Sequence, residues 1–205
     1  MAIEEVYNNQ SSAIASYNYE DLAENTGVKL FYAATTNSDE ILTQNQIYSN
    51  NIELSGAVSS NAYAVILDKD FDLTAFNAPQ IVRGTAYFNY TLYNSSAVDE
   101  YMHIYIRKWD GSAETEIANL SGALFISGAY GARVETLSIP ITNTPFKEGE
   151  QLRVTANLYA RRSTGAAEKV AFGSDPMNRD GALIIPSTDG TISQFKCWIP
   201  FNLDL

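Results

Sequence analysis

The sequence predicts an all-β protein: an antiparallel β-sandwich of the jelly-roll or Greek-key type, preceded by an extended N-terminal arm. Short runs that alternate apolar and polar residues recur along the chain, as in strands buried on one face. Gly, Asn, Asp and Pro separate these runs at the spacing of sandwich turns. No stretch keeps a helical period for three turns and no internal repeat is visible, which argues against helical bundles, propellers and solenoids.

The chain divides into an arm and one domain. Residues 1–27 are rich in Asn, Gln, Ser and Glu and show no sustained period, which we interpret as an extended arm, with simple terminal disorder as the alternative. The arm carries tyrosines that would bury against a neighbouring subunit, namely Tyr7, Tyr17 and Tyr19. Residues 28–205 are then expected to form the sandwich.

Eight or nine strands are expected within this domain. They fall at 28–34, 41–54 (one or two strands), 62–72, 81–93, 99–120 (a hairpin), 133–141, 151–161 and 191–205. Alternation is clearest in two of them, whose inward positions are Val82, Ala86, Phe88, Tyr90 and Leu92 in one and Leu152, Val154, Ala156, Leu158 and Ala160 in the other. The segments 121–131 and 162–190 are expected to be long loops.

A hairpin is predicted around Asp110-Gly111, because this pair suits a type I′ turn between alternating strands. A two-residue loop sets Arg107 opposite Glu114, an opposite-charge pair that helps to fix the register. Tyr105 then faces Glu116. The buried face would carry Ile104, Ile106, Thr115 and Ile117.

Composition excludes several classes of function. The 205 residues include 24 acidic and 13 basic side chains, a formal charge of -11, which argues against a nucleic-acid surface. No segment reaches the roughly 18 apolar residues of a membrane-spanning helix. The N-terminus lacks the charged and apolar regions of a secretory signal. A single cysteine, Cys197, rules out an intrachain disulfide and a thiolate metal cluster within one chain.

No catalytic residue is predicted. His103 is the only histidine, and the two-residue loop places Ala118 and Glu116 beside it rather than a serine or cysteine, so we interpret it as a surface or interface residue. Cys197 shares the apolar face of the last strand. Phosphate-binding, dinucleotide-binding, zinc-protease and nucleophile-elbow motifs are absent from the sequence.

Neither a metal ion nor a cofactor is expected. Asp68-Lys-Asp-Phe-Asp72 resembles the start of a calcium loop. The positions that need Gly and Glu hold Leu73 and Pro79, which excludes an EF-hand and leaves another carboxylate-cluster calcium site open. The 24 acidic residues also form many pairs, none of which is marked as the carboxylate pair of a glycosidase.

Aromatic residues exceed what the core strands need, with 13 Tyr, 9 Phe and 2 Trp. Alternation points several tyrosines outward: Tyr87, Tyr93, Tyr101, Tyr105 and Tyr159. Amphipathic rings on a sheet form either a protein interface or a sugar-stacking surface, and we favour the interface. Arg153 and Arg161 lie on the same outward side of their strand and would join it.

Several segments carry a resemblance to a known group of proteins. They are Ile-Arg-Lys-Trp-Asp-Gly at 106–111, Phe-Lys-Glu-Gly-Glu-Gln-Leu-Arg-Val-Thr at 146–155, Ser-Asp-Pro-Met-Asn-Arg-Asp-Gly at 174–181 and the terminal Ile-Pro-Phe-Asn-Leu-Asp-Leu. From Tyr17 onward the chain resembles β-rich structural proteins of tailed viruses. The resemblance implies a virion component of the capsid-decoration, fibre or tail-associated type, and it supplies no catalytic residues.

The resulting expectation is a non-enzymatic virion structural protein, most simply a capsid decoration or capsid-associated subunit. It would assemble with itself, plausibly as a trimer, and with major capsid or other virion proteins, through sandwich interfaces and the arm. Nucleic acid and membrane are not expected partners. The alternative is a receptor- or carbohydrate-binding head of a viral fibre or tail, which would bind a host-surface glycan through the loops 121–131 and 162–190. A hydrolase is a third, less favoured class.

Overall fold

The computed structural model describes residues 27–95, 97–126, 131–163, 168–179 and 194–202. This part of the chain is all strand and turn, with no helix. Its strands are β1 (Gly27–Thr35), β2 (Glu40–Thr43), β3 (Glu53–Val58), β4 (Ala64–Asp72), β5 (Gln80–Asn94), β6 (Val98–Trp109), β7 (Glu114–Ser121), β8 (Phe125–Ile126), β9 (Gly131–Phe146), β10 (Gln151–Arg162), β11 (Glu168–Gly173) and β12 (Phe195–Asn202).

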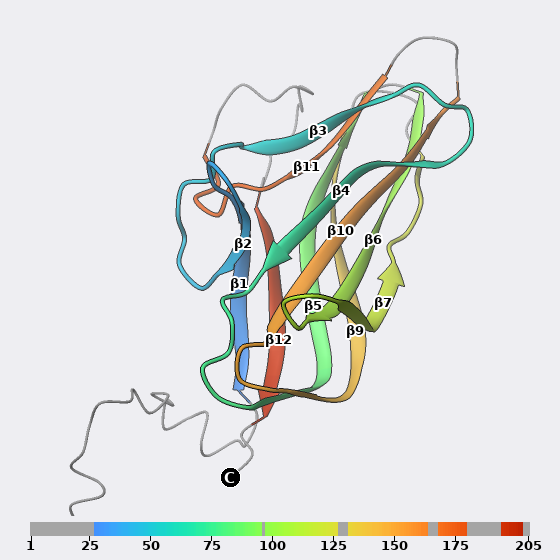
Figure 1. Cartoon of the computed structure of the whole chain (residues 1–205). Helices are drawn as coiled ribbons and strands as arrows, with labels where there is room; N and C mark the ends of the chain where they lie inside the picture. The colour runs from blue at the N-terminus through green and yellow to red at the C-terminus, as the bar shows by residue number, and fades with distance from the viewer. Residues whose placement is uncertain (1–26, 96, 127–130, 164–167, 180–193, 203–205) are drawn as a thin grey trace, which may run out of the picture.

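The strands form two packed layers, so the predicted β-sandwich is confirmed (Figure 1). One layer, the front sheet, has the order β4-β10-β6-β7, and β8 also pairs with β6. The other layer contains β5, β12 and β1, with β9 pairing along β5 and the β3–β11 pair continuing from one end of β5. The layers are joined at one edge, where β2 pairs antiparallel with β1 and makes a single parallel bridge, Ile41 to Asp72, with β4.

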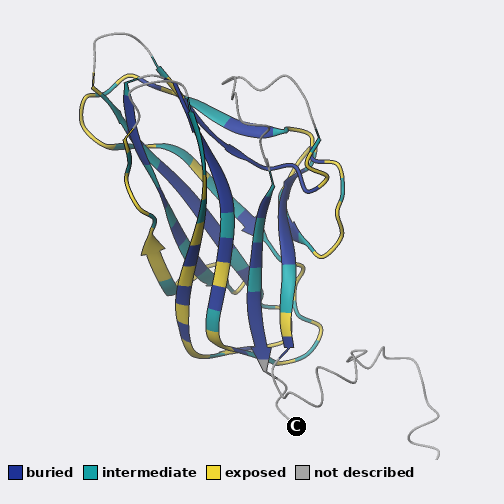
Figure 2. Ribbon diagram, turned by 180° about the vertical axis from the view of Figure 1, so that it is seen from behind, coloured by how far each residue is buried: buried dark blue, intermediate teal, exposed yellow. Residues whose placement is uncertain are grey.

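The core lies between the two layers, and the residues that alternation predicts to point inward form part of it. The expected inward residues of β5 and β10 are all buried, and buried and exposed bands alternate along the rear strands (Figure 2). Phe195 of β12 lies at the centre, with ring centroids 5.7 Å from Phe71, 6.1 Å from Tyr90 and 6.0 Å from Phe172. Cys197 is buried beside it and its thiol pKa is raised by burial, as expected for a core cysteine.

The segment expected as a loop at 162–190 contains a strand. β11 pairs with β3 and with the end of β5, and its last four residues are all buried. A short strand covered on both faces lacks alternation, so its period gives no signal. Its pairing also corrects the prediction for Tyr93, which faces Ala171 in the ladder and is fully buried rather than outward.

The β6–β7 hairpin forms at Asp110-Gly111, but the expected register is wrong. The loop is closed by the Asp110 N–H donating to Ala113 O at 3.2 Å, and the Asp110 carboxylate accepts from the N–H groups of Ser112 and Ala113 at 2.8 and 2.7 Å. These bonds hold a wider loop in which only Gly111 has positive φ, at 94°, whereas a type I′ turn needs two such residues.

A bulge then shifts the pairing further. Trp109 faces Glu114 and Arg107 faces Glu116, after which Ile106 faces Ala118. The predicted Arg107–Glu114 ion pair nevertheless exists diagonally, with Nη1 2.9 Å from Oε2. The shift brings a different set of β7 side chains beside His103, because each cross-strand neighbour moves along the strand.

The predicted arm, residues 1–27, lies outside the described residues except for Gly27, which begins β1. Among the residues that the structure describes, no helix is long and apolar enough to span a membrane.

Candidate functional site

The outward face of the front sheet gathers most of the aromatic and charged residues noted in the sequence. Antiparallel partners point to the same side of a sheet. The register of β10 with β6 therefore creates outward rows, namely Arg161 with Asp99, Tyr159 with Tyr101, Asn157 with His103, Thr155 with Tyr105, and Arg153 with Arg107. β4 and β7 extend these rows on either side.

A tyrosine cluster, formed by Tyr63, Tyr101 and Tyr159, occupies one end of this face. The rings of Tyr101 and Tyr159 are parallel, with centroids 5.0 Å apart. Tyr63 meets Tyr101 edge to face at 5.6 Å, and the Arg161 guanidinium lies 4.7 Å from the Tyr63 ring centroid. Asp99 fixes that guanidinium through a 2.8 Å ion pair, so the cluster is held in place by stacking and by charge.

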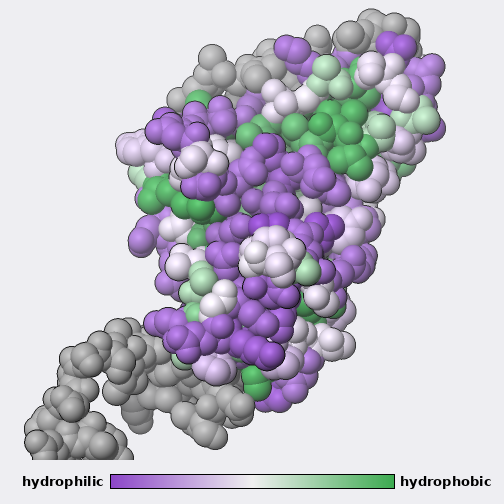
Figure 3. Space-filling model, in the orientation of Figure 1, coloured by the Kyte–Doolittle hydropathy of each residue, from purple (hydrophilic) through white to green (hydrophobic). Residues whose placement is uncertain are grey.

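A hollow of about 350 Å³ adjoins the cluster and is lined by Tyr63, Tyr101, Ser121, Gly122 and Leu124. Tyr159 stacks on the Tyr101 ring from the neighbouring strand β10, and the hollow is bordered by Tyr101 and Tyr63 together with residues at the end of β7 and just after it. The front face is largely hydrophilic, with an apolar patch near its upper right end in Figure 3. The hollow combines an aromatic wall with a hydroxyl group.

Burial first, and then the neighbouring tyrosine Tyr159, raise the pKa of Tyr101 above its ordinary value. The same two causes raise the pKa of Tyr105. Both phenols therefore stay protonated at neutral pH and can donate as well as accept hydrogen bonds.

His103 stands beside the hollow and is held by its neighbours on β6 and β7. Its ring stacks on Tyr105 with centroids 4.3 Å apart and planes 9° from parallel. Nδ1 lies 2.9 Å from Ser121 Oγ and Nε2 lies 3.1 Å from Asn119 Oδ1. The expectation that no serine lies beside His103 is therefore wrong, and its cause is the shifted register of β7, which pairs Ser121 directly with His103.

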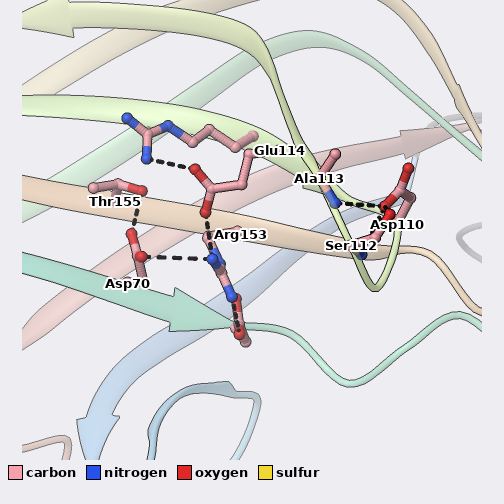
Figure 4. Close-up of polar contacts among 9 residues, drawn as sticks. Asp70, Asp110, Ser112, Ala113, Glu114, Arg153 and Thr155 are labelled. Carbon is pink, nitrogen blue, oxygen red and sulfur yellow. Dashed lines mark hydrogen bonds and ion pairs between the residues drawn. The ribbon is translucent and has the colours of Figure 1, made fainter.

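An ion cluster around Arg153 occupies the opposite end of the face (Figure 4). Its Nε and Nη2 donate to the two carboxylate oxygens of Asp72 at 2.6 and 2.7 Å, and Nη1 also contacts Glu114. The hydrogen bond with Asp72 is the main cause that raises the pKa of Arg153. Thr155 Oγ1 donates to Asp70 at 2.5 Å.

These contacts bear on the calcium hypothesis for Asp68–Asp72. Asp70 and Asp72 both form ion pairs with Arg153, whose guanidinium lies where a shared cation would have to bind. Within the described ranges, no group of three or more His, Cys, Asp or Glu side chains is arranged to hold a metal ion.

Of the predicted interface residues, Tyr105, Tyr159, Arg153 and Arg161 share the front face. Tyr87 is 46% exposed on β5, in the other layer. Tyr7, Tyr17 and Tyr19 lie outside the described residues. Their role in subunit contacts stays a prediction.

Tyr63 and Asn119 were not predicted as members of the site, and Ser121 was placed only within the glycan-binding loop 121–131 of the alternative. A strand was expected from residue 62, but β4 begins at Ala64, so Tyr63 precedes it. The directions of Asn119 and Ser121 depend on the bulge in the hairpin.

No protein-family model matches the sequence, and no curated protein matches it. Solved structures do match. The chain is similar to a CocE/NonD family hydrolase from Staphylococcus aureus, with a TM-score of 0.56 and 13% identity over 87% of this chain. An α-amino acid ester hydrolase matches with a TM-score of 0.59 and 8% identity over 85% of this chain. An aminopeptidase from a marine sediment Thaumarchaeota archaeon matches with a TM-score of 0.59 and 8% identity over 88%.

The chain spans little more than a third of these proteins, 37%, 36% and 37% of their respective lengths. At such low identity the likeness establishes the fold, and the activities named for these proteins are theirs. The VP2 capsid protein of infectious bursal disease virus has a weak structural similarity, with a TM-score of 0.36, which is too low to support an argument.

These comparisons correct two expectations drawn from the sequence. The chain was expected to be a non-enzymatic virion structural protein, with a viral fibre head as the alternative. The solved structures that share its fold with TM-scores of 0.52 to 0.59 are instead hydrolases and an aminopeptidase. The turn and strand segments behind the viral resemblance follow from the β-sandwich itself, because turn residues and alternation recur in unrelated sandwiches.

Proposed function

We propose that this chain is the β-sandwich domain of a hydrolytic enzyme and that it binds a neutral saccharide ring in the hollow beside Tyr101. The observation that carries the proposal is the aromatic wall of that hollow. Tyr101 and Tyr63, whose rings meet edge to face 5.6 Å apart, both line the hollow, and Tyr159 stacks on Tyr101 and holds its ring in place. A sugar ring has an apolar face that packs on such a wall, with hydroxyl groups around its edge.

The groups around the hollow suit those hydroxyls. Ser121 lines it, the protonated phenol of Tyr101 can donate and accept, and the Arg161–Asp99 pair borders the cluster. Donors and acceptors therefore lie beside the aromatic wall, as recognition of a polyol requires.

The net charge of the protein and the volume of the hollow limit the class of ligand. The net charge of -11 disfavours an anionic polysaccharide, and a hollow of about 350 Å³ is at the small end of ligand sites, which suits one or two rings. The hydrolase assignment is supported by the fold similarity, since the chain has the size of one part of those larger proteins.

The test is a titration of the purified protein with a panel of neutral monosaccharides, their methyl glycosides and disaccharides, followed by chemical-shift perturbation. We expect at least one sugar to bind and Tyr101→Ala to weaken its affinity about tenfold, because loss of one stacked ring costs about 0.5–1.5 kcal/mol beyond lost contact area. Tyr87→Ala is the matched control, since Tyr87 is an exposed tyrosine on the other layer. Equal losses in both variants would overturn the proposal, as would no binding to the folded protein.

A further inference from the structure

A directed chain of hydrogen bonds runs along β7 and ends on His103. Asn119 Nδ2 donates to Glu116 Oε1 at 2.6 Å. A carboxylate only accepts, so this bond fixes the orientation of the Asn119 amide and turns its Oδ1 toward His103 Nε2, 3.1 Å away. Because Oδ1 also only accepts, Nε2 must carry the imidazole proton.

The neutral tautomer set in this way leaves a lone pair on Nδ1. Ser121 Oγ lies 2.9 Å from that nitrogen, so the serine hydroxyl donates to the imidazole. This is the arrangement of a nucleophile, a general base and a residue that orients the base. Stacking of His103 on Tyr105 restricts rotation of the imidazole ring, which holds Nδ1 toward the serine.

Asn119 connects His103 to a carboxylate. The Asn119 amide bonds to His103 Nε2 on one side and to Glu116 Oε1 on the other, so the imidazole that takes the serine proton at Nδ1 keeps its second nitrogen hydrogen-bonded.

The serine is also accessible to a substrate, because it lines the hollow next to Tyr101. We infer that Ser121 is a nucleophile, activated by His103 as general base, that accepts acyl groups from ester substrates entering this hollow. This goes beyond the proposed saccharide binding, since it assigns a chemical step that a small ester without a sugar can undergo.

The proposed reaction is an acyl transfer in which each bond formed is matched by a bond broken. Ser121 Oγ forms a bond to the ester carbonyl carbon as its proton moves to His103 Nδ1. The bond from that carbon to the alcohol oxygen breaks, and His103 returns the proton to the departing oxygen. Water then attacks the acyl-serine in the same way and releases the carboxylic acid. Asn119 is a positioning residue that keeps the required tautomer.

The experiment uses phenylmethanesulfonyl fluoride, whose sulfur forms a bond to the serine oxygen while fluoride leaves and the proton passes to the base. We expect peptide mass spectrometry to find the label on Ser121 of the whole chain. The labelling rate should fall about 100-fold in His103→Gln, the usual contribution of a general base. Ser112→Ala is the control, because that hydroxyl bonds only to the hairpin carboxylate of Asp110.

Hydrolysis of p-nitrophenyl acetate supplies a second measurement. An exposed imidazole can cleave this ester without a serine, so the inference requires Ser121→Ala to lower the rate to that of an equal concentration of free imidazole while His103 is still present. Asn119→Leu should slow the reaction, and Asn119→Asp, which keeps an acceptor for Nε2, should restore it. A rate in Ser121→Ala equal to that of the wild type, or a label that forms equally fast in His103→Gln, would overturn the inference. Saccharide binding by His103→Gln, which changes a residue outside the lining of the hollow, tests the proposed function separately and should persist.

Discussion

Replacing Glu100 with Gln should stabilise the protein in a pH-dependent way. Glu100 lies on the inward side of β6 and is fully buried, and neither carboxyl oxygen has a hydrogen-bond partner among the described residues. Desolvation raises its pKa well above the ordinary value of 4.5, and the positive charge of Arg133 offsets this only in part.

The direction of this pH dependence follows from whether Glu100 holds a proton in the folded and in the unfolded chain. Below pH 4.5, the ordinary pKa, Glu100 is protonated in both the folded and the unfolded chain, so the wild type and Glu100→Gln should have similar stability. Above it the unfolded chain loses the proton while the folded chain keeps it. The wild type then loses about 1.4 kcal/mol of unfolding free energy relative to the variant for each pH unit, until the raised pKa is passed.

The assay is urea unfolding of both proteins at a series of pH values, compared as the difference in unfolding free energy at each pH. Subtracting the variant removes the contributions of the other acidic groups. Glu148→Gln, the same change at an exposed position, serves as the control and should show no such slope. A difference for Glu100→Gln that stays flat with pH would mean that the carboxyl group is ionised in the folded protein, contrary to the prediction.

Two further predictions concern packing and charge on the sheets. Arg153→Met should lower the unfolding free energy by about 2 kcal/mol, because it leaves the carboxylate of Asp72 without its two charged hydrogen bonds; an unchanged urea midpoint would contradict the ion cluster. Gly56→Ala should cost about 1–3 kcal/mol, since its Cβ would lie 2.4 Å from Cγ2 of the stiff side chain of Ile66. Gly111→Ala, which meets no atom within 4 Å but has positive φ, should cost only about 1 kcal/mol, and calorimetry that ranked the two in the opposite order would contradict the packing.

The sequence predicts the orientation of a strand correctly where the alternation of apolar and polar residues alone decides which face is buried. Alternation assigns the inward faces of β5 and β10 correctly, because each strand has one face against the core. It fails for β11, where both faces are covered, and for Tyr93, which β11 buries. These outcomes depend on which strands become neighbours, and that is a property of the whole fold.

The candidate site could be predicted only in part, because some of its contacts depend on the register of one hairpin. The outward directions of Tyr101, Tyr105 and Tyr159 follow from period two, and the structure confirms them. The neighbours of His103 depend on the β6–β7 register, which the Asp110 carboxylate and one bulge decide. The same shift that makes the expected register wrong also places Ser121 beside the imidazole, so the hydrogen bond between them could not be predicted from the two-residue loop.

A saccharide titration followed by the chemical shifts of the backbone amides shows directly whether the hollow is a ligand site. We expect the shifts caused by a neutral sugar to cluster on residues around the hollow, at Tyr63, Tyr101, Ser121 and Leu124. We also expect Tyr101→Ala to weaken binding about tenfold while Tyr87→Ala does not. Shifts centred on another part of the molecule, or no shifts from any neutral sugar in the panel, would contradict the claim that this hollow is a ligand site.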